Sequence, residues 1–377
     1  MSASAPAAQR LVSLDALRGL TVIGMILVNA TAGMYYGLKA QVFPLLLHAH
    51  WDGLTLADAV FPAFLTMVGV SIPLSLSKAR AGSGLDAVQA QKIFWRTLRL
   101  FAIGWLLSNL HWLANFDGGP WRFWGVLQRI ALVYGAAAVL FLTCGPRLRL
   151  GLIVGLLLIY WPLTLIPAPD SLPNDLWQRG HNFAAAVDRL MFGAGGHNYV
   201  KGPEGYDPEG LLGTLPAIAQ ALIGMAMGEY LLRPRPRSAV TLAAAGAALL
   251  LSGIAWGFVF PVIKDIWSSS FVLVTAGLTL LVLAPLHGWL DKGAPVTGPV
   301  AGPVSFAIAF GVNAIAAYVL HFLLNDLLGW QLYTQTYFAT RDVVGEPVAA
   351  LFPVVLFILT IWLPVDYLRR RGWIIRA

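Results

Sequence analysis

The sequence contains few charged residues. Only 11% of its 377 residues are Asp, Glu, Lys or Arg, whereas soluble domains carry about 25%. A water-facing surface cannot be built from so few ionisable groups, and the hydrophobic fraction of 58% agrees with this. These fractions exclude a soluble enzyme, a disordered chain and a fibrous repeat, and they predict a polytopic membrane protein.

Cysteine is almost absent as well. Because Cys144 is the only one, no intramolecular disulfide can form, and its place in an apolar run is typical of a packing residue. The sequence also lacks clustered metal ligands beyond one His-x-His pair with nearby aspartates, so we predict no metal site.

Ten apolar stretches are long enough to cross a bilayer as helices. The first is not a signal peptide, because it contains Asp15 and Arg18 and no small-residue cleavage site follows it. The sequence therefore predicts an all-α polytopic membrane protein, with one transmembrane domain over residues 1–377. The predicted spans are 14–34, 57–77, 93–110, 124–143, 149–166, 211–231, 239–260, 269–287, 304–324 and 348–368.

The basic residues are distributed unevenly between the two sides of these spans. Sixteen of the 25 Lys and Arg fall on the side of the two termini and seven on the other, which predicts that both termini are cytoplasmic. The net charge of +7 thus reports topology, and a nucleic-acid partner is excluded. The outer loop 167–210 contains five Pro and seven Gly, so we expect an irregular and functional segment.

The richest polar stretch joins the first two predicted spans. His48, His50, Asp52 and Asp58 fall within eleven residues, with Trp51 among them. An imidazole exchanges protons near neutral pH and a carboxylate can fix its tautomer, so this stretch is a candidate acid–base site. The alternative is an interfacial loop in which Trp51 belongs to the aromatic belt.

Isolated polar residues also occur in or beside the spans. Asn29 is either interhelical glue or part of a site. Arg129, which follows Gln128, cannot lose its charge and needs a carboxylate or a ligand phosphate as its partner. At the cytoplasmic start of the first span, Arg18 either pairs with Asp15 at i, i+3 as an anchor or attracts an anionic ligand such as a nucleotide diphosphate.

Four further residues extend this pattern. Asn313 and His321 are eight positions apart on the ninth predicted span, which puts them on one face, although a lone His is often a core residue. Asp207 and Glu209 precede the sixth span, where they either cap its helix or bind a ligand. Because most of these polar residues fall at or near the outer face, the sequence predicts one polar cavity that opens outward.

Five blocks of the sequence resemble, in order, the heparan-α-glucosaminide N-acetyltransferase family. This family belongs to the transmembrane acyltransferases, and its members move acetyl groups from acetyl-CoA to amino sugars beyond the membrane. The blocks are Ser13-Leu14-Asp15-Ala16-Leu17-Arg18-Gly19-Leu20 with Val28-Asn29; His48-Ala49, Trp51-Asp52-Gly53-Leu54-Thr55, Asp58 and Val60-Phe61-Pro62; Gly125-Val126-Leu127-Gln128-Arg129; Tyr206-Asp207-Pro208-Glu209-Gly210; and Asn313 with Tyr318 to His321.

The resemblance implies that His48 is the active-site histidine and that Asn29, Arg129 and His321 lie near the reacting centre. His48 then accepts a proton from the attacking amine or takes the acetyl group itself. Asn29 and His321 are candidate donors to the thioester oxygen, and Asp52 orients a histidine or meets the ammonium of the sugar. We predict catalytic roles for His48, Asn29, His321 and Asp52, substrate contacts from Trp51, Asp58, Asp207, Glu209 and Asn313, and acetyl-CoA contacts from Arg129, Gln128 and Arg18.

The resemblance also implies an acceptor, a location and partners. Because the first span begins within a few residues of residue 1, we expect glucosamine or a short glucosamine oligomer as acceptor rather than heparan sulfate itself. Length and basicity favour a bacterial inner-membrane protein, in contact with lipid, whose site faces the periplasm, and the family favours a homodimer. The rival hypothesis is a secondary transporter for an amino sugar, which the outward clustering of charge argues against.

Overall fold

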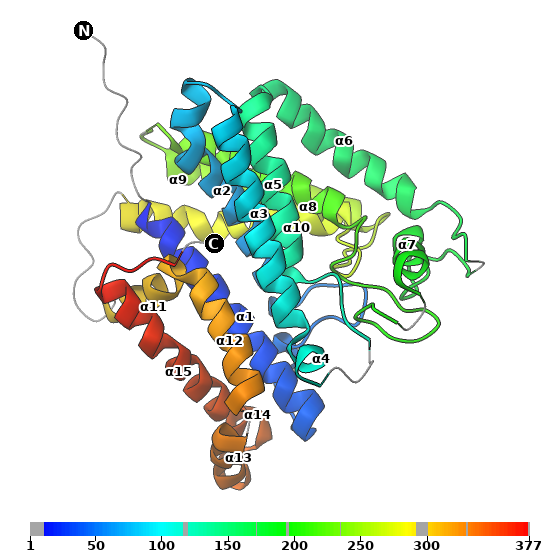
Figure 1. The fold of residues 1–377 in the computed structure, drawn as a ribbon, viewed down its shortest axis with the longest axis vertical. Helices are drawn as coiled ribbons and strands as arrows, with labels where there is room; N and C mark the ends of the chain where they lie inside the picture. The colour runs from blue at the N-terminus through cyan, green and yellow to red at the C-terminus, as the bar shows by residue number, and fades with distance from the viewer. Residues whose placement is uncertain are drawn as a thin grey trace. The chain divides into compact units, whose positions relative to one another are not determined.

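The computed structural model describes residues 11–115, 120–170, 172–193, 196–233, 235–291, 301–328 and 331–375. In these residues the chain is helical and contains no β-strand (Figure 1), which confirms the predicted all-α class. The first ten and the last two residues, which bear on the predicted cytoplasmic termini, lie outside the described part of the chain.

Helices occupy all ten predicted spans, but the described residues contain seven that are long and apolar enough to cross a membrane. Two others, α3 (Ala87–Ser108) and α8 (Thr214–Leu231), fall short of that standard, so the count of ten stays a prediction. The seven are α1 (Val12–Leu38), α2 (Leu56–Ala81), α5 (Val126–Thr143), α6 (Pro146–Thr164), α9 (Ser238–Gly257), α10 (Ser269–Leu286) with the π-turn His287–Asp291, and α14 (Glu346–Ala349) with α15 (Leu351–Arg370). Shorter elements are a 3-10 turn (Pro44–Leu46), α4 (Leu110–Asn115), α7 (Phe183–Phe192) and α13 (Gln331–Val344).

The ninth predicted span, 304–324, is not one straight helix. It is divided into α11 (Ala301–Val312) and α12 (Ala314–Leu328), which are bent by 84° at Asn313. The Asn313 amide binds the backbone of the C-terminal tail, because its Nδ2 donates to the Trp373 carbonyl (3.1 Å) and its Oδ1 accepts from the Ile375 N–H (3.0 Å). Side-chain bonds of this kind compete with regular helix, so the expected single face shared with His321 is wrong.

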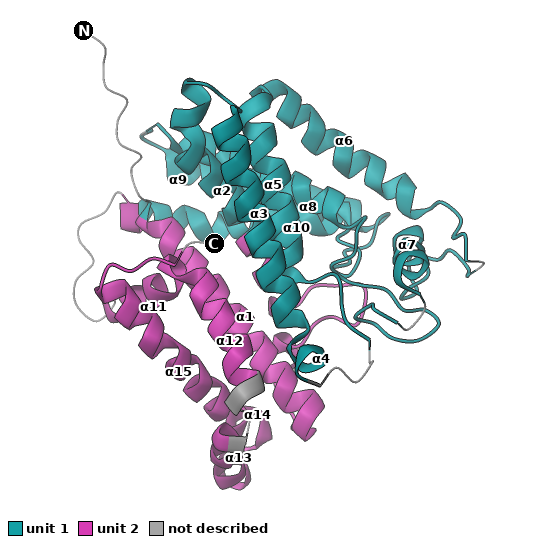
Figure 2. Ribbon diagram, in the orientation of Figure 1, with its two compact units in different colours: residues 1–11, 65–288 teal, residues 12–64, 289–377 magenta. Residues whose placement is uncertain are grey.

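The chain forms two compact units (Figure 2). Unit 1 comprises residues 1–11 and 65–288, and unit 2 comprises residues 12–64 and 289–377. The single transmembrane domain predicted over 1–377 remains a prediction.

Unit 1 is held together by helix pairs with small residues at their contacts. α3 packs along α5, and α9 packs along α10 (Figure 1). Where α2 approaches α8, a Cβ atom on Gly69 would lie 2.0 Å from the Ala221 carbonyl oxygen, and one on Gly224 would lie 2.0 Å from that of Thr66. Lipid is as apolar as the helix surfaces, so the hydrophobic effect does not drive helices together within a membrane. Close approach of the backbones instead strengthens the van der Waals packing between them. The loop 167–210 adds α7 and irregular segments, as its Pro and Gly content predicted.

In unit 2, glycines likewise allow the backbones of α1 and α11 to approach closely. A Cβ atom on Gly19 would lie 1.7 Å from the Ala307 carbonyl oxygen, and one on Gly311 would lie 1.8 Å from that of Asp15. α12, α13 and α15 complete this unit around the first helix. The contact fixes α1, and the loop that follows α1 carries His48 to the start of α2.

Candidate functional site

In unit 2, the ring of His48 is held by Asp58. His48 Nδ1 lies 2.8 Å from the Asp58 carboxylate, whose side chain is only 1% exposed, while the histidine side chain is 42% exposed. The other Asp58 oxygen accepts from the N–H groups of Ala49 (3.0 Å) and Thr55 (3.1 Å), and the Thr55 hydroxyl lies 2.9 Å away. A carboxylate with these donors acts as an acceptor toward the imidazole. His48 Nδ1 therefore donates to Asp58, which leaves Nε2 as the nitrogen that accepts a proton in the neutral ring.

Local sequence explains why Asp58 takes this place. Thr55 immediately precedes α2, and Asp58 is the third residue inside it, so Thr55-x-x-Asp58 forms the returning half of a capping box. The positive end of the helix further stabilises the carboxylate. This four-residue signal was sufficient to find the role of Asp58 from sequence, although the prediction gave Asp58 to substrate binding.

Asp52 does not hold the histidine. Its side chain is exposed and makes no hydrogen bond or ion pair to any other described residue. The expectation that Asp52 orients a histidine is therefore wrong, because Asp52 lies in an extended loop before the helix, whereas Asp58 lies inside its first turn. Its predicted contact with the ammonium of a sugar stays a prediction.

The other predicted residues of unit 2 are placed differently from one another. Asn29 is exposed on α1 between buried Val28 and Ala30, so the reading of Asn29 as buried interhelical glue is wrong. His321 is buried on α12 with its ring 5.0 Å from that of Phe322 and 5.8 Å from that of Phe357. Neither Asn29 nor His321 makes a hydrogen bond or ring contact with His48 within the described residues.

Trp51 is 7% exposed, which fits packing better than an exposed belt position. Arg18 Nη1 lies 3.4 Å from Asp15 Oδ1, which confirms the predicted i, i+3 pair.

In unit 1, Arg122 joins two of the predicted substrate residues. Its Nε and Nη2 donate to the two carboxylate oxygens of Asp207 (2.9 and 2.7 Å), and Nη2 also donates to Glu209 (2.5 Å). The guanidinium lies 4.5 Å over the ring of Tyr199. Burial lowers the pKa of Arg122, but the two carboxylates outweigh this and raise that pKa above its usual value. Burial would likewise raise the pKa of Asp207, and Arg122 holds it below its ordinary value instead.

This triad corrects one expectation and reveals one missed residue. The N-cap of α8 is Gly213, so neither Asp207 nor Glu209 caps that helix. From the sequence, Arg122 is only one of the seven cations predicted on the outer side. No local signal identifies its partners, because they lie 85 and 87 positions further along the chain.

Arg129 stands in contrast to Arg122. It is 1% exposed at the start of α5, where Nη2 donates to the Gly210 carbonyl (3.0 Å) and the guanidinium lies 4.9 Å over the ring of Trp267. Its Nε and Nη1 atoms are buried without a hydrogen-bond partner. No carboxylate of the described residues lies within ion-pair distance of it. Arg129 was predicted to pair with a carboxylate or with a ligand phosphate, and the described residues do not supply the carboxylate.

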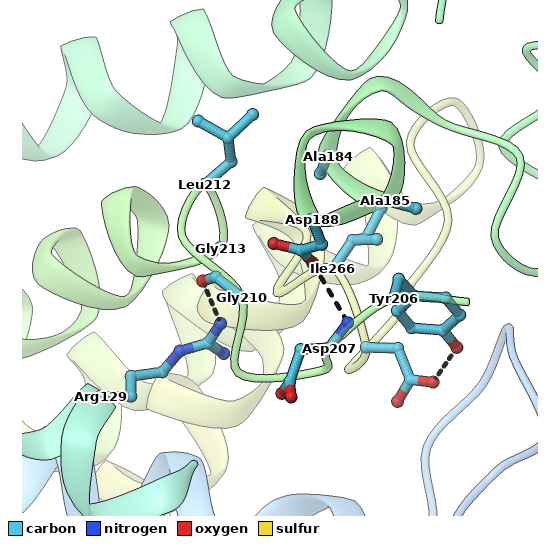
Figure 3. Close-up of a pocket in the computed structure, with 11 residues that line it drawn as sticks. Arg129, Ala184, Ala185, Asp188, Tyr206, Asp207, Gly210, Leu212, Gly213 and Ile266 are labelled. Atoms are coloured by element: carbon cyan, nitrogen blue, oxygen red, sulfur yellow. Dashed lines mark hydrogen bonds between the residues drawn. The ribbon is translucent and has the colours of Figure 1, made fainter. Parts of the chain in front are cut away.

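A small cavity borders Arg129 (Figure 3). Its volume of about 10 Å³ matches a single water molecule, and Asp188 and Tyr206 face it from other segments. Asp188, on α7, is 3% exposed and accepts long hydrogen bonds from the N–H groups of Asp207 (3.2 Å) and Leu211 (3.4 Å). Burial raises the pKa of Asp188 to about 7. Asp188 was not predicted from the sequence, because nothing in the local sequence shows that α7 turns this side chain inward.

The raised pKa of Asp188 predicts a pH dependence of stability. The folded state binds this proton up to about pH 7, whereas an unfolded Asp releases it near pH 3.9. The contribution of Asp188 to the free energy of unfolding is therefore fully present below pH 4. It falls by about 1.4 kcal/mol per pH unit as pH rises toward 7. We expect the melting temperature of the wild type to fall more between pH 5 and pH 8 than that of Asp188→Asn, measured in detergent. Parallel curves would contradict the burial of an ionisable carboxyl here.

Gln128 does not reach the cavity. It is fully buried, its Nε2 donates to the Phe123 carbonyl (3.1 Å), and its side chain fills the space left by Gly104 and Gly125. The structure therefore gives Gln128 a packing position, and its predicted acetyl-CoA contact stays a prediction. Among the described residues, no three His, Cys, Asp or Glu side chains are arranged to hold a metal ion.

Comparison with known sequences finds relatives for most of the chain. A family model described as "Heparan-alpha-glucosaminide N-acetyltransferase, catalytic" matches residues 10–256, which include His48 and Arg129. The chain is similar to two proteins named heparan-alpha-glucosaminide N-acetyltransferase. The Homo sapiens protein is 30% identical over 346 residues, which are 77% of this chain and 50% of the relative. The Mus musculus protein is 28% identical over 380 residues, which are 86% of this chain and 55% of the relative. The Escherichia coli (strain K12) protein "Uncharacterized protein YeiB" is 28% identical over 261 residues (66% and 65%). The chain thus spans about half the length of its two named relatives.

Proposed function

Because the chain belongs to the heparan-alpha-glucosaminide N-acetyltransferase family, we propose that it is a membrane-embedded acetyltransferase. The donor is acetyl-CoA, and the acceptor is the amine of a glucosamine-type sugar, in line with the names of its relatives. The reaction takes place at the periplasmic side of a bacterial inner membrane, with both termini in the cytoplasm. The excess of Lys and Arg on the side of the termini supports this orientation.

The observation that carries this proposal is the His48–Asp58 pair. An amine attacks a thioester only when it is unprotonated, and His48 Nε2 accepts its proton as the new N–C bond forms. The C–S bond then breaks, and the CoA thiolate takes up a proton. Asp58 keeps the Nδ1 proton in place throughout and stabilises the imidazolium cation that forms. In the alternative route, Nε2 attacks the thioester carbon, the C–S bond breaks and the CoA thiolate leaves as an acetyl-imidazole forms. The amine then attacks the acetyl carbon, the bond from that carbon to Nε2 breaks, and the imidazole takes up the proton that the amine loses.

Other residues supply binding. The unsatisfied N–H groups of Arg129 donate to an oxygen of the acetyl donor. Asn29 and His321 donate to the thioester oxygen as it gains negative charge. An exposed amide in the middle of an apolar helix, as at Asn29, is costly against lipid, which supports a polar surrounding for that residue.

A direct assay tests the reaction against the transporter hypothesis. The purified protein in detergent is incubated with acetyl-CoA and glucosamine, and N-acetylglucosamine and free CoA thiol are measured. We expect both products in equal amounts, since each transferred acetyl group releases one CoA. Transport cannot explain this result, because a detergent solution contains no sealed membrane. Uptake of glucosamine into proteoliposomes without any acetylated product would favour the transporter instead. Acetyl label that remains on His48 after incubation with acetyl-CoA alone would identify the covalent route.

Replacing Asp58 by Asn is expected to lower kcat by about 100-fold or more. The amide can turn its NH₂ group toward His48 Nδ1, which favours the wrong tautomer or releases the ring. Steady-state kinetics with both substrates measure the effect. Asp52→Asn is the matched comparison, since it makes the same chemical change six positions earlier in an exposed side chain. A loss from Asp52→Asn that equals the loss from Asp58→Asn would contradict the assignment.

A further inference from the structure

The two outer arginines of unit 1 are stabilised in opposite ways. Arg122 is neutralised by the two carboxylates of Asp207 and Glu209. Arg129 is more deeply buried, yet it is held by one carbonyl and by the face of an indole. An indole face stabilises a cation without cancelling its charge or using its N–H groups. The comparison indicates that the surroundings of Arg129 keep its charge available.

Trp267 supplies that face, and it is held firmly. The residue is fully buried and has a φ of 56°, a left-handed conformation that is uncommon for a bulky side chain. Its indole Nε1 donates to Gln220 Oε1 (2.9 Å), and Gln220 Nε2 donates to the hydroxyls of Thr66 and Thr275 (both 3.1 Å). This buried chain of bonds reaches α2, α8 and α10, so the indole cannot turn without breaking its bond to Gln220.

The loop that carries Trp267 is equally constrained. The Ser268 hydroxyl accepts from the Ile263 N–H (3.0 Å), and the Ser270 hydroxyl donates to the Pro261 carbonyl (2.9 Å). On the other side, the Tyr160 hydroxyl donates to the Ile266 carbonyl (2.6 Å). A strained residue inside a loop with so many bonds indicates that the surroundings impose its conformation.

We propose that Trp267 is a positioning residue for Arg129. Its ring holds the charged guanidinium in the buried site while Nε and Nη1 stay directed at an oxygen of a bound ligand. Gln220 supports the ring from behind. The proposal rests on the proposed function only for the identity of the ligand, which is the acetyl donor.

A double-mutant cycle tests the positioning role. The variants are Trp267→Leu, Arg129→Met and their combination, and the readouts are the KM for acetyl-CoA, kcat and the melting temperature without ligand. We expect Trp267→Leu to raise the KM for acetyl-CoA by roughly 3- to 30-fold, with a much smaller change in kcat. In the Arg129→Met background, the same substitution should change KM by less than about 2-fold, because the residue acts through the missing arginine.

Two further variants guard against a trivial result. Trp267→Phe keeps an aromatic face and loses the bond to Gln220 and one ring, so it should disturb the buried site less than Trp267→Leu and should give a smaller rise in KM. Trp124→Leu removes another buried tryptophan of unit 1 that contacts no cation in the described part of the chain, and its effect should add to that of Arg129→Met. Equal effects of Trp267→Leu in both backgrounds would overturn the proposal.

The outcomes separate the two proposals. Coupling of Trp267 and Arg129 in melting temperature but not in KM would show a purely structural pair and would also overturn the positioning role. If the wild type transfers no acetyl group, the proposed function fails. The positioning role is then tested with the same three variants, whose affinity for CoA is measured by thermal shift. If the effects of Trp267→Leu and Arg129→Met on this affinity are additive, the positioning role is overturned as well.

Discussion

Alanine in place of His48 is expected to lower kcat for acetyl transfer by about 10³-fold or more. The imidazole is the only group in the 47–58 loop that can exchange a proton near neutral pH while a buried carboxylate fixes its tautomer. Because the His48 side chain is 42% exposed, its removal leaves no buried cavity, and Asp58 keeps its other donors from Ala49 and Thr55, so the melting temperature should change little. Steady-state rates of N-acetylglucosamine formation, with the melting curve of the same preparation, measure both effects.

His50→Ala is the matched control for this experiment. His50 lies two positions away, is exposed and makes no hydrogen bond to another described residue, so its rate should equal that of the wild type. Added imidazole should restore part of the activity of His48→Ala if the residue acts as a base. Full activity of His48→Ala, or an equal loss in His50→Ala, would remove His48 from the reaction.

Methionine in place of Arg122 is expected to lower the free energy of unfolding by roughly 3 kcal/mol, the lower end of the range for buried pairs, because Arg122 is 22% exposed. The substitution leaves Asp207 and Glu209, with side chains 0% and 8% exposed, without their cation. The difference from the wild type should be largest near pH 7. It should shrink as pH falls below about 4, because the depressed pKa of Asp207 contributes stability only where the unfolded carboxyl is ionised.

The same substitution at an exposed pair gives the control. Arg341 lies 3.6 Å from Asp342, whose side chain is 87% exposed, so Arg341→Met should cost less than about 1 kcal/mol. Thermal unfolding of both variants between pH 3 and pH 7 makes the comparison. If Arg122→Met unfolds like Arg341→Met at neutral pH, the buried triad does not stabilise unit 1.

Local patterns in the sequence predicted several features well. Helices appear at each predicted span, and the pair of Arg18 with Asp15 forms as its spacing indicated. The His48 region was predicted as a polar site, and within it the structure pairs His48 with Asp58 rather than with Asp52. The capping signal Thr55-x-x-Asp58 was present and decides between the two aspartates, because a residue in the first helical turn is fixed in space relative to the loop before it.

Features that depend on distant partners were not predictable. Asp207 and Glu209 were read as helix caps or ligand contacts, whereas the structure pairs both with Arg122. The bend at Asn313 depends on backbone groups of Trp373 and Ile375, some sixty positions away. A span that reads as one apolar helix gives no sign of such a bond, since hydropathy averages over the residue that breaks it.

The scarcity of charge therefore determined, from the sequence alone, that this is a helical membrane protein, and the order of its motifs pointed to its family. These properties depend on composition and on neighbours within a few turns, which the sequence states directly. The tertiary structure decided which charges are neutralised. It gives Arg122 two carboxylates and gives Arg129 an indole, although both are arginines seven positions apart. Burial and partner together decide whether an arginine holds the fold or binds a ligand, and both arise only when segments far apart in the chain meet.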